Sequence, residues 1–164
     1  MGSEMCIRDR IIVGPNKLTG EWGQNPIPGP MDEYEKSVKR HCGRVGAVEV
    51  FLSGPGLENY YEHITKTKIS SRDIVSLYQE NDSVAGEVMD VYFERIARSF
   101  STFVNILDPD VIVCGGGMSE IDEIYDEVPN RIIPYIASNF FLTPIVKATH
   151  GSSSGVRGAA HLWN

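Results

Sequence analysis

Residues 107–122, LDPDVIVCGGGMSEID, constrain the fold more than any other part of this chain. An Asp-Pro-Asp turn leads into the apolar run at 111–114, three glycines follow, and an amphipathic segment begins after them. A short apolar run bounded by turn residues is typical of a strand that is covered on both faces. The succession of helix, buried strand, glycine turn and helix indicates an α/β layered domain.

The rest of the chain fits that class. Apolar residues recur at helical spacing in a helix from 47 that is stopped by the Gly-Pro-Gly at 54–56 and resumes at 57–64, and in a long helix over 83–107. Ser70 and Asp73 have the spacing of a capping box, which predicts a helix over 70–80. We also expect a helix over 121–136 disturbed by Pro129 and Pro134, a strand at 145–148, a last helix at 156–162 and at most one early strand at 11–13.

Composition excludes several classes of protein. The 164 residues carry a net charge of −7, without a basic run, which argues against a nucleic-acid partner and against an anionic membrane surface. No apolar run approaches the ~20 residues of a membrane span, and no secretion signal is visible. Three cysteines without framework spacing predict reduced thiols in the cytoplasm. Residues 1–10 lack periodicity, and we expect them to be a non-native or disordered leader.

The glycine triplet Gly115, Gly116 and Gly117 has two explanations. Glycines after a strand allow positive φ and let a ligand approach the backbone, and amides near the next helix can bind phosphate or sugar oxygens. The pattern lacks both the GK[ST] of a Walker A motif and the spacing of G-x-G-x-x-G. A purely structural tight turn is an equally good explanation of the triplet taken alone.

Four motifs resemble one family. The chain contains four motifs in the order found in the ROK family (repressors, open reading frames and kinases): GEWGQNPIP, HCGRVGAVEVFLSGPG, NILDPDVIVCGGGMS and HGSSSGVRGAAHLW. The pattern GEWG-x-NP-x-P at residues 20–28 resembles the fructokinases of this family. The resemblance implies the C-terminal lobe of the hexokinase/actin-like (ribonuclease H-like) ATPase fold over residues 11–164, with the N-terminal lobe missing. It further implies that Gly115, Gly116 and Gly117 contact the adenosine of ATP.

The same resemblance implies a sugar site. Glu21 and Glu49 match glutamates that hydrogen-bond the hexose, and carboxylates suit this task because they accept from adjacent hydroxyls. Without the resemblance, Glu21 reads as a solvated side chain and Glu49 as a residue that complements a helix dipole. Gln24 stands where the family has a histidine that contacts the sugar and binds zinc. An amide can still contact a hydroxyl, but it is a poor metal ligand.

The family's zinc motif, C-x-C-G-x-x-G-C-x-E, is mostly lost. It reads here as RHCGRVGAVE over residues 40–49, so that Cys42 is the one remaining ligand of four, and His41 a possible second. A structural zinc ion requires four nitrogen or sulfur ligands. We therefore expect no structural zinc and no other protein-bound metal, with packing holding this loop.

The resulting hypothesis is the C-terminal part of a fructokinase that transfers phosphate from ATP with Mg²⁺ to the 6-hydroxyl of a hexose. The catalytic base is expected on the absent N-terminal lobe, so this chain alone is expected to be inactive. Association into a homo-oligomer, by resemblance a dimer, is expected. Three alternatives remain open: a glucokinase, mannokinase or N-acetylhexosamine kinase of the family, a sugar-sensing ROK transcriptional repressor, and a non-catalytic nucleotide- or sugar-binding module.

Overall fold

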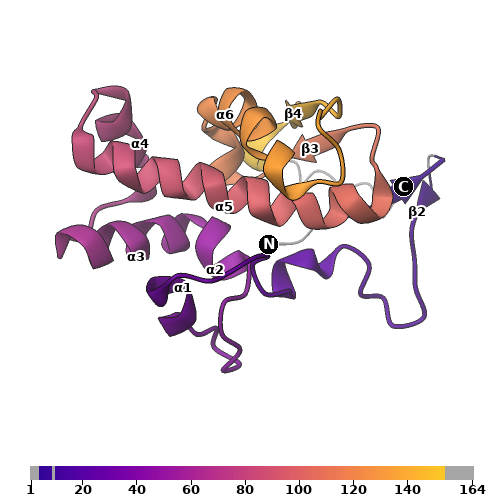
Figure 1. Cartoon of the computed structure of the whole chain (residues 1–164), viewed down its shortest axis with the longest axis horizontal. Helices are drawn as coiled ribbons and strands as arrows, with labels where there is room; N and C mark the ends of the chain where they lie inside the picture. Colours follow the sequence, from indigo (N-terminus) through magenta and orange to yellow (C-terminus); the bar gives the residue numbers. More distant parts are fainter. Residues whose placement is uncertain (1–3, 9, 154–164) are drawn as a thin grey trace.

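Helix α5 (Ser83–Leu107) forms the axis of the molecule in the computed structural model, which describes residues 4–8 and 10–153. In Figure 1, α2 and α3 lie along one side of α5, and α6, β3 and β4 lie along the other. The remaining elements have the following bounds: β1 (Cys6–Ile7), β2 (Arg10–Ile11), η1 (Glu21–Gln24), α1 (Glu33–Ser37), α2 (Glu49–Leu52), α3 (Gly54–Thr65), α4 (Ser71–Gln79), β3 (Ile112–Cys114), η2 (Gly117–Glu120), α6 (Glu123–Arg131), η3 (Ile133–Tyr135), β4 (Ile145–Lys147) and η4 (Gly151–Ser153).

The sequence predicted α5 with its observed bounds. Asp82 caps its first turn by accepting a hydrogen bond from the amide of Ala85 at 2.8 Å. Its last turn ends at Asp108, which adopts the left-handed conformation (φ 43°) directly before Pro109. The apolar stripe expected at helical spacing is buried at its first four positions: Val88, Tyr92, Ile96 and Phe100. Its last two members differ, because Phe103 is partly buried and Leu107 is 38% exposed.

The helix predicted over 70–80 is confirmed as α4, and Ser70 caps it by accepting a hydrogen bond from the amide of Asp73 at 3.2 Å. The second bond differs from that of a capping box, because the Asp73 carboxylate accepts from the Ser70 hydroxyl at 2.7 Å. The glycine–proline stretch at 54–56 behaves differently from the expectation. It ends α2, as predicted, but it also forms the first turn of α3, with Ser53 as N-cap and the proline in the first turn. Proline is compatible with that place because the first amides of a helix have no intrahelical acceptor.

Strands β3 and β4 are parallel, with Ile112 opposite Ile145, and α6 lies in the connection between them. Both of these isoleucines are buried, whereas Val113 is 59% and Val146 38% exposed. The expectation of a strand covered on both faces is therefore wrong for one face. The side chains of the first face pack into the core that also contains Ile124 of α6, and in the structure the second face remains open to solvent at these two valines.

Two further expectations differ in detail. The helix expected over 121–136 divides into α6 and η3, with Pro129 inside α6 and Pro134 in η3. Residues Cys6–Ile7 pair antiparallel with Arg10–Ile11, so part of the leader forms a short hairpin with the start of the expected strand at 11–13. That the leader is foreign to the protein stays a prediction. The helix expected at 156–162 lies outside the described residues.

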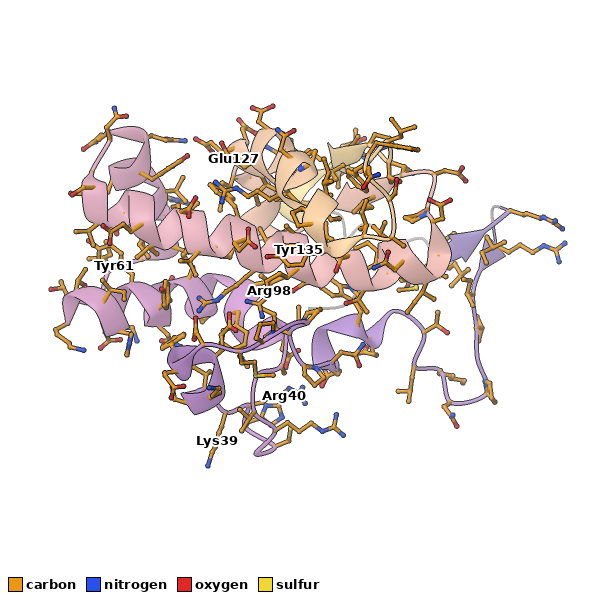
Figure 2. The ribbon with its side chains drawn as sticks, viewed as in Figure 1. Lys39, Arg40, Tyr61, Arg98, Glu127 and Tyr135 are labelled. Carbon is orange, nitrogen blue, oxygen red and sulfur yellow. The ribbon has the colours of Figure 1, made fainter. Side chains whose placement is uncertain are left out.

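A buried ion network attaches the segment before α2 to α5. Glu35, 1% exposed, accepts hydrogen bonds from Arg95 Nε at 2.9 Å and from Arg98 Nη1 at 3.1 Å. Arg98 also donates to the carbonyl of Pro28 at 2.8 Å, and Figure 2 shows it on the side of α5 that faces this segment. The Arg95 guanidinium lies 4.3 Å from the ring centroid of Tyr60, a cation–π contact. These contacts fix the loop that leads into the candidate site.

Candidate sugar and nucleotide site

Two segments that are distant in the sequence lie side by side at the start of α2. The amide of Ile27 donates to the carbonyl of Gly46 at 2.8 Å, and the amide of Val48 donates to the carbonyl of Asn25 at 2.9 Å. These backbone hydrogen bonds flank the bridge between residues 26 and 47. The pairing brings the end of η1 next to the first residue of α2.

The pairing places two of the three predicted sugar residues in contact. Gln24 Nε2 donates a hydrogen bond to Glu49 Oε2 at 3.2 Å. The other oxygen, Oε1, accepts a hydrogen bond from Arg40 Nε, which also forms an ion pair with the carboxylate. Glu49 is 18% and Arg40 20% exposed, so this group of three side chains is mostly removed from water. We call Gln24, Arg40 and Glu49 the carboxylate triad.

Glu21, the third predicted residue, is not part of the triad. It begins η1, three residues before Gln24, and its side chain is exposed. Within the described residues, no side-chain hydrogen bond or ion pair of Glu21 is present. Its place on the same short 3₁₀ helix is compatible with sugar contact, and its role stays a prediction.

The loop that would hold zinc in the family is a tight hairpin. Its residues 39 and 45 form an antiparallel bridge, and the amide of Arg40 donates to the carbonyl of Arg44 at 2.8 Å. Arg40 Nη1 lies 3.5 Å from Cys42 Sγ. In the part of the chain that the structure describes, no three His, Cys, Asp or Glu side chains are grouped so that they could hold a metal ion. The absence of zinc stays a prediction.

The glycine triplet lies at the carboxyl end of β3. Gly116 adopts φ 91° and ψ 179°, a backbone conformation that residues other than glycine rarely adopt. Gly117 begins η2. All three glycines are exposed, and a Cβ added at Gly116 or Gly117 would meet no atom within 4 Å. Close packing within the described protein therefore explains neither of these two glycines, while the backbone conformation does explain Gly116.

The carboxyl ends of both parallel strands meet at this place. The amide of Ala148 donates to the carbonyl of Cys114 at 2.8 Å, and the amide of Gly116 lies 3.5 Å from the carbonyl of Gly151. An open pocket beside the triplet is lined by Glu120 and by residues 147–151. In open α/β sheets, ligands bind beyond the carboxyl ends of the strands, so this edge of the sheet is a suitable place for a ligand. That the ligand is the adenosine of ATP stays a prediction.

Sequence reasoning missed two charged residues of these sites. Lys147 borders the pocket and pairs with Glu120 at 2.8 Å and with Asp122 at 3.3 Å. Nothing in its sequence neighbourhood singled it out. Arg40 had a signal, because it stands at the first cysteine position of the zinc motif. An arginine at the position of a zinc-binding cysteine indicates that another contact, here with Glu49, takes the place of the bond from that cysteine to zinc.

The thiol of Cys42 in the hairpin and the thiol of Cys114 at the end of β3 differ in pKa. A hydrogen bond from the backbone of Arg44 and a second from the Arg40 side chain lower the pKa of Cys42. Burial raises the pKa of Cys114 to about 11. Cys42 is accordingly the more acidic of these two thiols.

A family model describes the whole chain: the ROK family matches residues 1–164, and the chain belongs to this family. It is 35% identical over 165 residues to the N-acetyl-D-glucosamine kinase of Vibrio atlanticus (strain LGP32), covering 98% of this chain and 55% of that protein. The chain thus spans about half the length of the curated relatives it matches. The resemblance found in the motifs is confirmed at the level of the family.

Solved structures give the same fold. A ROK family glucokinase from Streptomyces griseus, in complex with glucose and AMPPNP, matches with a TM-score of 0.82 and 19% identity over 98% of this chain and 56% of that one. A ROK family transcriptional regulator, a homologue of the E. coli MLC protein, matches with a TM-score of 0.69 and 19% identity over 89% of this chain and 38% of that one. The fold is the hexokinase/actin-like (ribonuclease H-like) one that the sequence predicted.

Proposed function

We propose that the protein containing this chain is an ATP-dependent hexose kinase and that the carboxylate triad binds the sugar. The observation that carries the proposal is the contact of Gln24 with Glu49, a carboxylate whose two oxygens are both held by neighbours. A carboxylate has about four acceptor sites, so hydrogen bonds from Arg40 and Gln24 leave capacity for two sugar hydroxyls. The named relative, an N-acetyl-D-glucosamine kinase, supports a sugar kinase.

The proposed nucleotide site is the glycine triplet at the carboxyl end of β3. The proposed adenosine contacts are Gly115, Gly116 and Gly117, which are all exposed, and there is open space for a ligand where a Cβ would stand at Gly116 and at Gly117. The AMPPNP-bound S. griseus enzyme of the same fold supports an adenine nucleotide. Mg²⁺ would neutralise charge on the transferred phosphate of the bound ATP. Glu21, Gln24 and Glu49 would orient the sugar while the 6-hydroxyl attacks in line.

The identity of the hexose has two candidates. The fructokinase-like motifs at residues 20–28 and 105–118 favour fructose. The 35% identity to an N-acetyl-D-glucosamine kinase favours N-acetylglucosamine. We propose the amino sugar first, because that identity extends over 98% of the chain, whereas the fructokinase-like motifs cover residues 20–28 and 105–118. A cytoplasmic location and a homodimer complete the proposal. The described residues include no helix long and apolar enough to cross a membrane.

Titration calorimetry of the chain with N-acetylglucosamine, fructose and glucose tests the sugar site. Glu49→Gln is expected to weaken sugar binding by about tenfold or more, because a hydrogen bond to a charged acceptor is exchanged for a weaker one. Glu33→Gln is the matched control, since Glu33 is exposed on α1 and pairs with Lys36 at 2.7 Å. Equal affinities of the two variants for every sugar would contradict the proposal.

A sugar-sensing repressor is the second candidate, supported by the ROK transcriptional regulator of the same fold. Sequencing the source DNA upstream of the codon for Ile11 separates the two. A continuous frame that encodes the family's Asp-Gly-Gly-Thr and Asn-Asp motifs supports the kinase. A frame that also encodes a winged helix ahead of that segment supports the repressor.

A further inference from the structure

The side chain of Arg40 links two elements of the candidate sugar site. Its Nε donates to Glu49 Oε1 at the start of α2, and its Nη1 lies 3.5 Å from Cys42 Sγ within the hairpin at 39–45. The backbone of Arg40 is itself fixed, because its amide donates to Arg44 and its carbonyl accepts from Gly43, both at 2.8 Å. Figure 2 shows Arg40 on this loop, beside the residues that precede α2.

We infer that Arg40 is a positioning residue for sugar binding: its guanidinium holds the Glu49 carboxylate in the orientation that receives the sugar hydroxyls. This inference rests on the proposed function for the identity of the ligand. In the motif RHCGRVGAVE, Arg40 stands where the family's zinc motif begins with cysteine. In this chain a guanidinium therefore supplies the connection between hairpin and helix, and it does so through the carboxylate itself.

The geometry explains why the orientation matters. A glutamate has three rotatable bonds, and fixing them before binding removes part of the entropic cost of binding. Arg40 engages one oxygen of Glu49 and Gln24 Nε2 engages the other at 3.2 Å, so the plane of the carboxylate is fixed from two sides. Both partners are donors, which keeps Glu49 an acceptor of hydrogen bonds. Such a site is suited to a neutral sugar that offers two hydroxyl donors and rejects a sugar acid.

The test compares Arg40→Met with Arg44→Met in the chain. Arg44 lies in the same hairpin, is exposed and contributes its backbone to the turn, so its side chain is the matched control. Affinity is measured by calorimetry with N-acetylglucosamine, or with fructose if that sugar binds more tightly. We expect the affinity for the sugar to fall about tenfold in Arg40→Met and less than about twofold in Arg44→Met. Arg40→Lys is expected to fall between wild type and Arg40→Met, because it keeps the charge and loses the planar fork.

A double-mutant cycle separates positioning from a general structural effect. If Arg40 acts through Glu49, adding Arg40→Met to Glu49→Gln causes little further loss of affinity. If Arg40→Met lowers the affinity by the same factor in the wild type and in Glu49→Gln, the inference is overturned, although the sugar site itself would stand. Wild-type affinity of Arg40→Met would overturn it as well.

A second readout needs no sugar. The Nε–Hε resonance of Arg40 in a ¹H–¹⁵N NMR spectrum is expected to be protected from exchange with water in the wild type and to lose this protection in Glu49→Gln. If no sugar binds, the proposed function fails, and protection of this resonance still reports whether the link exists. An Arg40 Hε that exchanges as fast as that of Arg44 would overturn the inference.

Discussion

Gly116 and Gly117 are adjacent residues with different structural requirements. Gly116 has positive φ with extended ψ, and Gly117 has neither positive φ nor a neighbour within 4 Å of an added Cβ. We expect Gly116→Ala to lower the free energy of unfolding by about 1–3 kcal/mol, because its backbone conformation is strained for any side chain. Gly117→Ala is expected to stay within about 0.5 kcal/mol of the wild type. Urea unfolding of both variants measures the difference.

The same pair distinguishes the two explanations of the triplet. If the glycines keep space open for adenosine, Gly117→Ala lowers the affinity for AMPPNP several-fold although the stability is unchanged. If the triplet is only a tight turn, Gly117→Ala binds AMPPNP like the wild type. The second result would remove the triplet from the nucleotide site.

Two cysteines are expected to differ in their reactivity with pH. Hydrogen bonds lower the pKa of Cys42, so its thiolate forms at a lower pH than that of an ordinary thiol. Burial raises the pKa of Cys114 to about 11, so its thiolate stays scarce until strongly alkaline pH. Between pH 6 and 8, iodoacetamide is expected to modify Cys42 much faster than Cys114. Mass spectrometry of the peptides gives both rates, and faster labelling of Cys114 would contradict this account.

At the scale of elements, the ion network around Glu35 joins α1 to α5. Its carboxylate is 1% exposed and is shared by Arg95 and Arg98. Replacing one partner of a buried ion pair leaves an uncompensated charge, which costs about 3–5 kcal/mol. We therefore expect Glu35→Gln to lower the free energy of unfolding by about that amount. Chemical denaturation monitored by circular dichroism measures it.

Glu33→Gln on the same helix provides the control for this prediction. Glu33 is 92% exposed and pairs with Lys36, a surface contact worth about 0–1 kcal/mol. Similar losses for the two variants would show that the network does not hold α1 in place. The buried charges would then be tolerated through water or rearrangement.

The elements that the sequence predicted correctly are those governed by local rules. The bounds of α5 follow from an uninterrupted apolar stripe, a capping aspartate and a following proline, and the start of α4 follows from Ser70 and Asp73. The open face of β3 could not be read in the same way. An apolar run indicates which side chains favour burial, but the exposure of Val113 depends on which other elements pack against the sheet.

The candidate site shows the same division. Gln24 and Glu49 are 25 positions apart, and only the family resemblance associates them with one sugar. Their contact depends on backbone pairing between residues 25–27 and 46–48, which no local pattern predicts. Arg40 was recognised only as a lost zinc ligand, because its partner Glu49 is identified by the three-dimensional structure.

At the scale of the whole molecule, the chain carries two candidate sites on different parts of the fold. The triad lies at the start of α2, and the glycine triplet lies at the carboxyl end of β3, next to β4. Helix α5 packs against α2 on one side and against α6 on the other, so it connects the two parts. The proposed kinase would need its sugar and its nucleotide bound at separate places with their reacting atoms in line. The two candidate sites lie at separate places in the fold.

The most direct test of the account is a ¹H–¹⁵N NMR titration of the chain with N-acetylglucosamine, repeated with fructose and with AMPPNP. We predict that the sugar shifts the amide resonances of residues 21–27 and 45–49 in a saturable manner and leaves those of α4 unchanged. AMPPNP is predicted to shift residues 115–120 instead. Sugar-induced shifts centred away from Gln24 and Glu49, or none with either sugar, would contradict the assignment of the carboxylate triad as the sugar site.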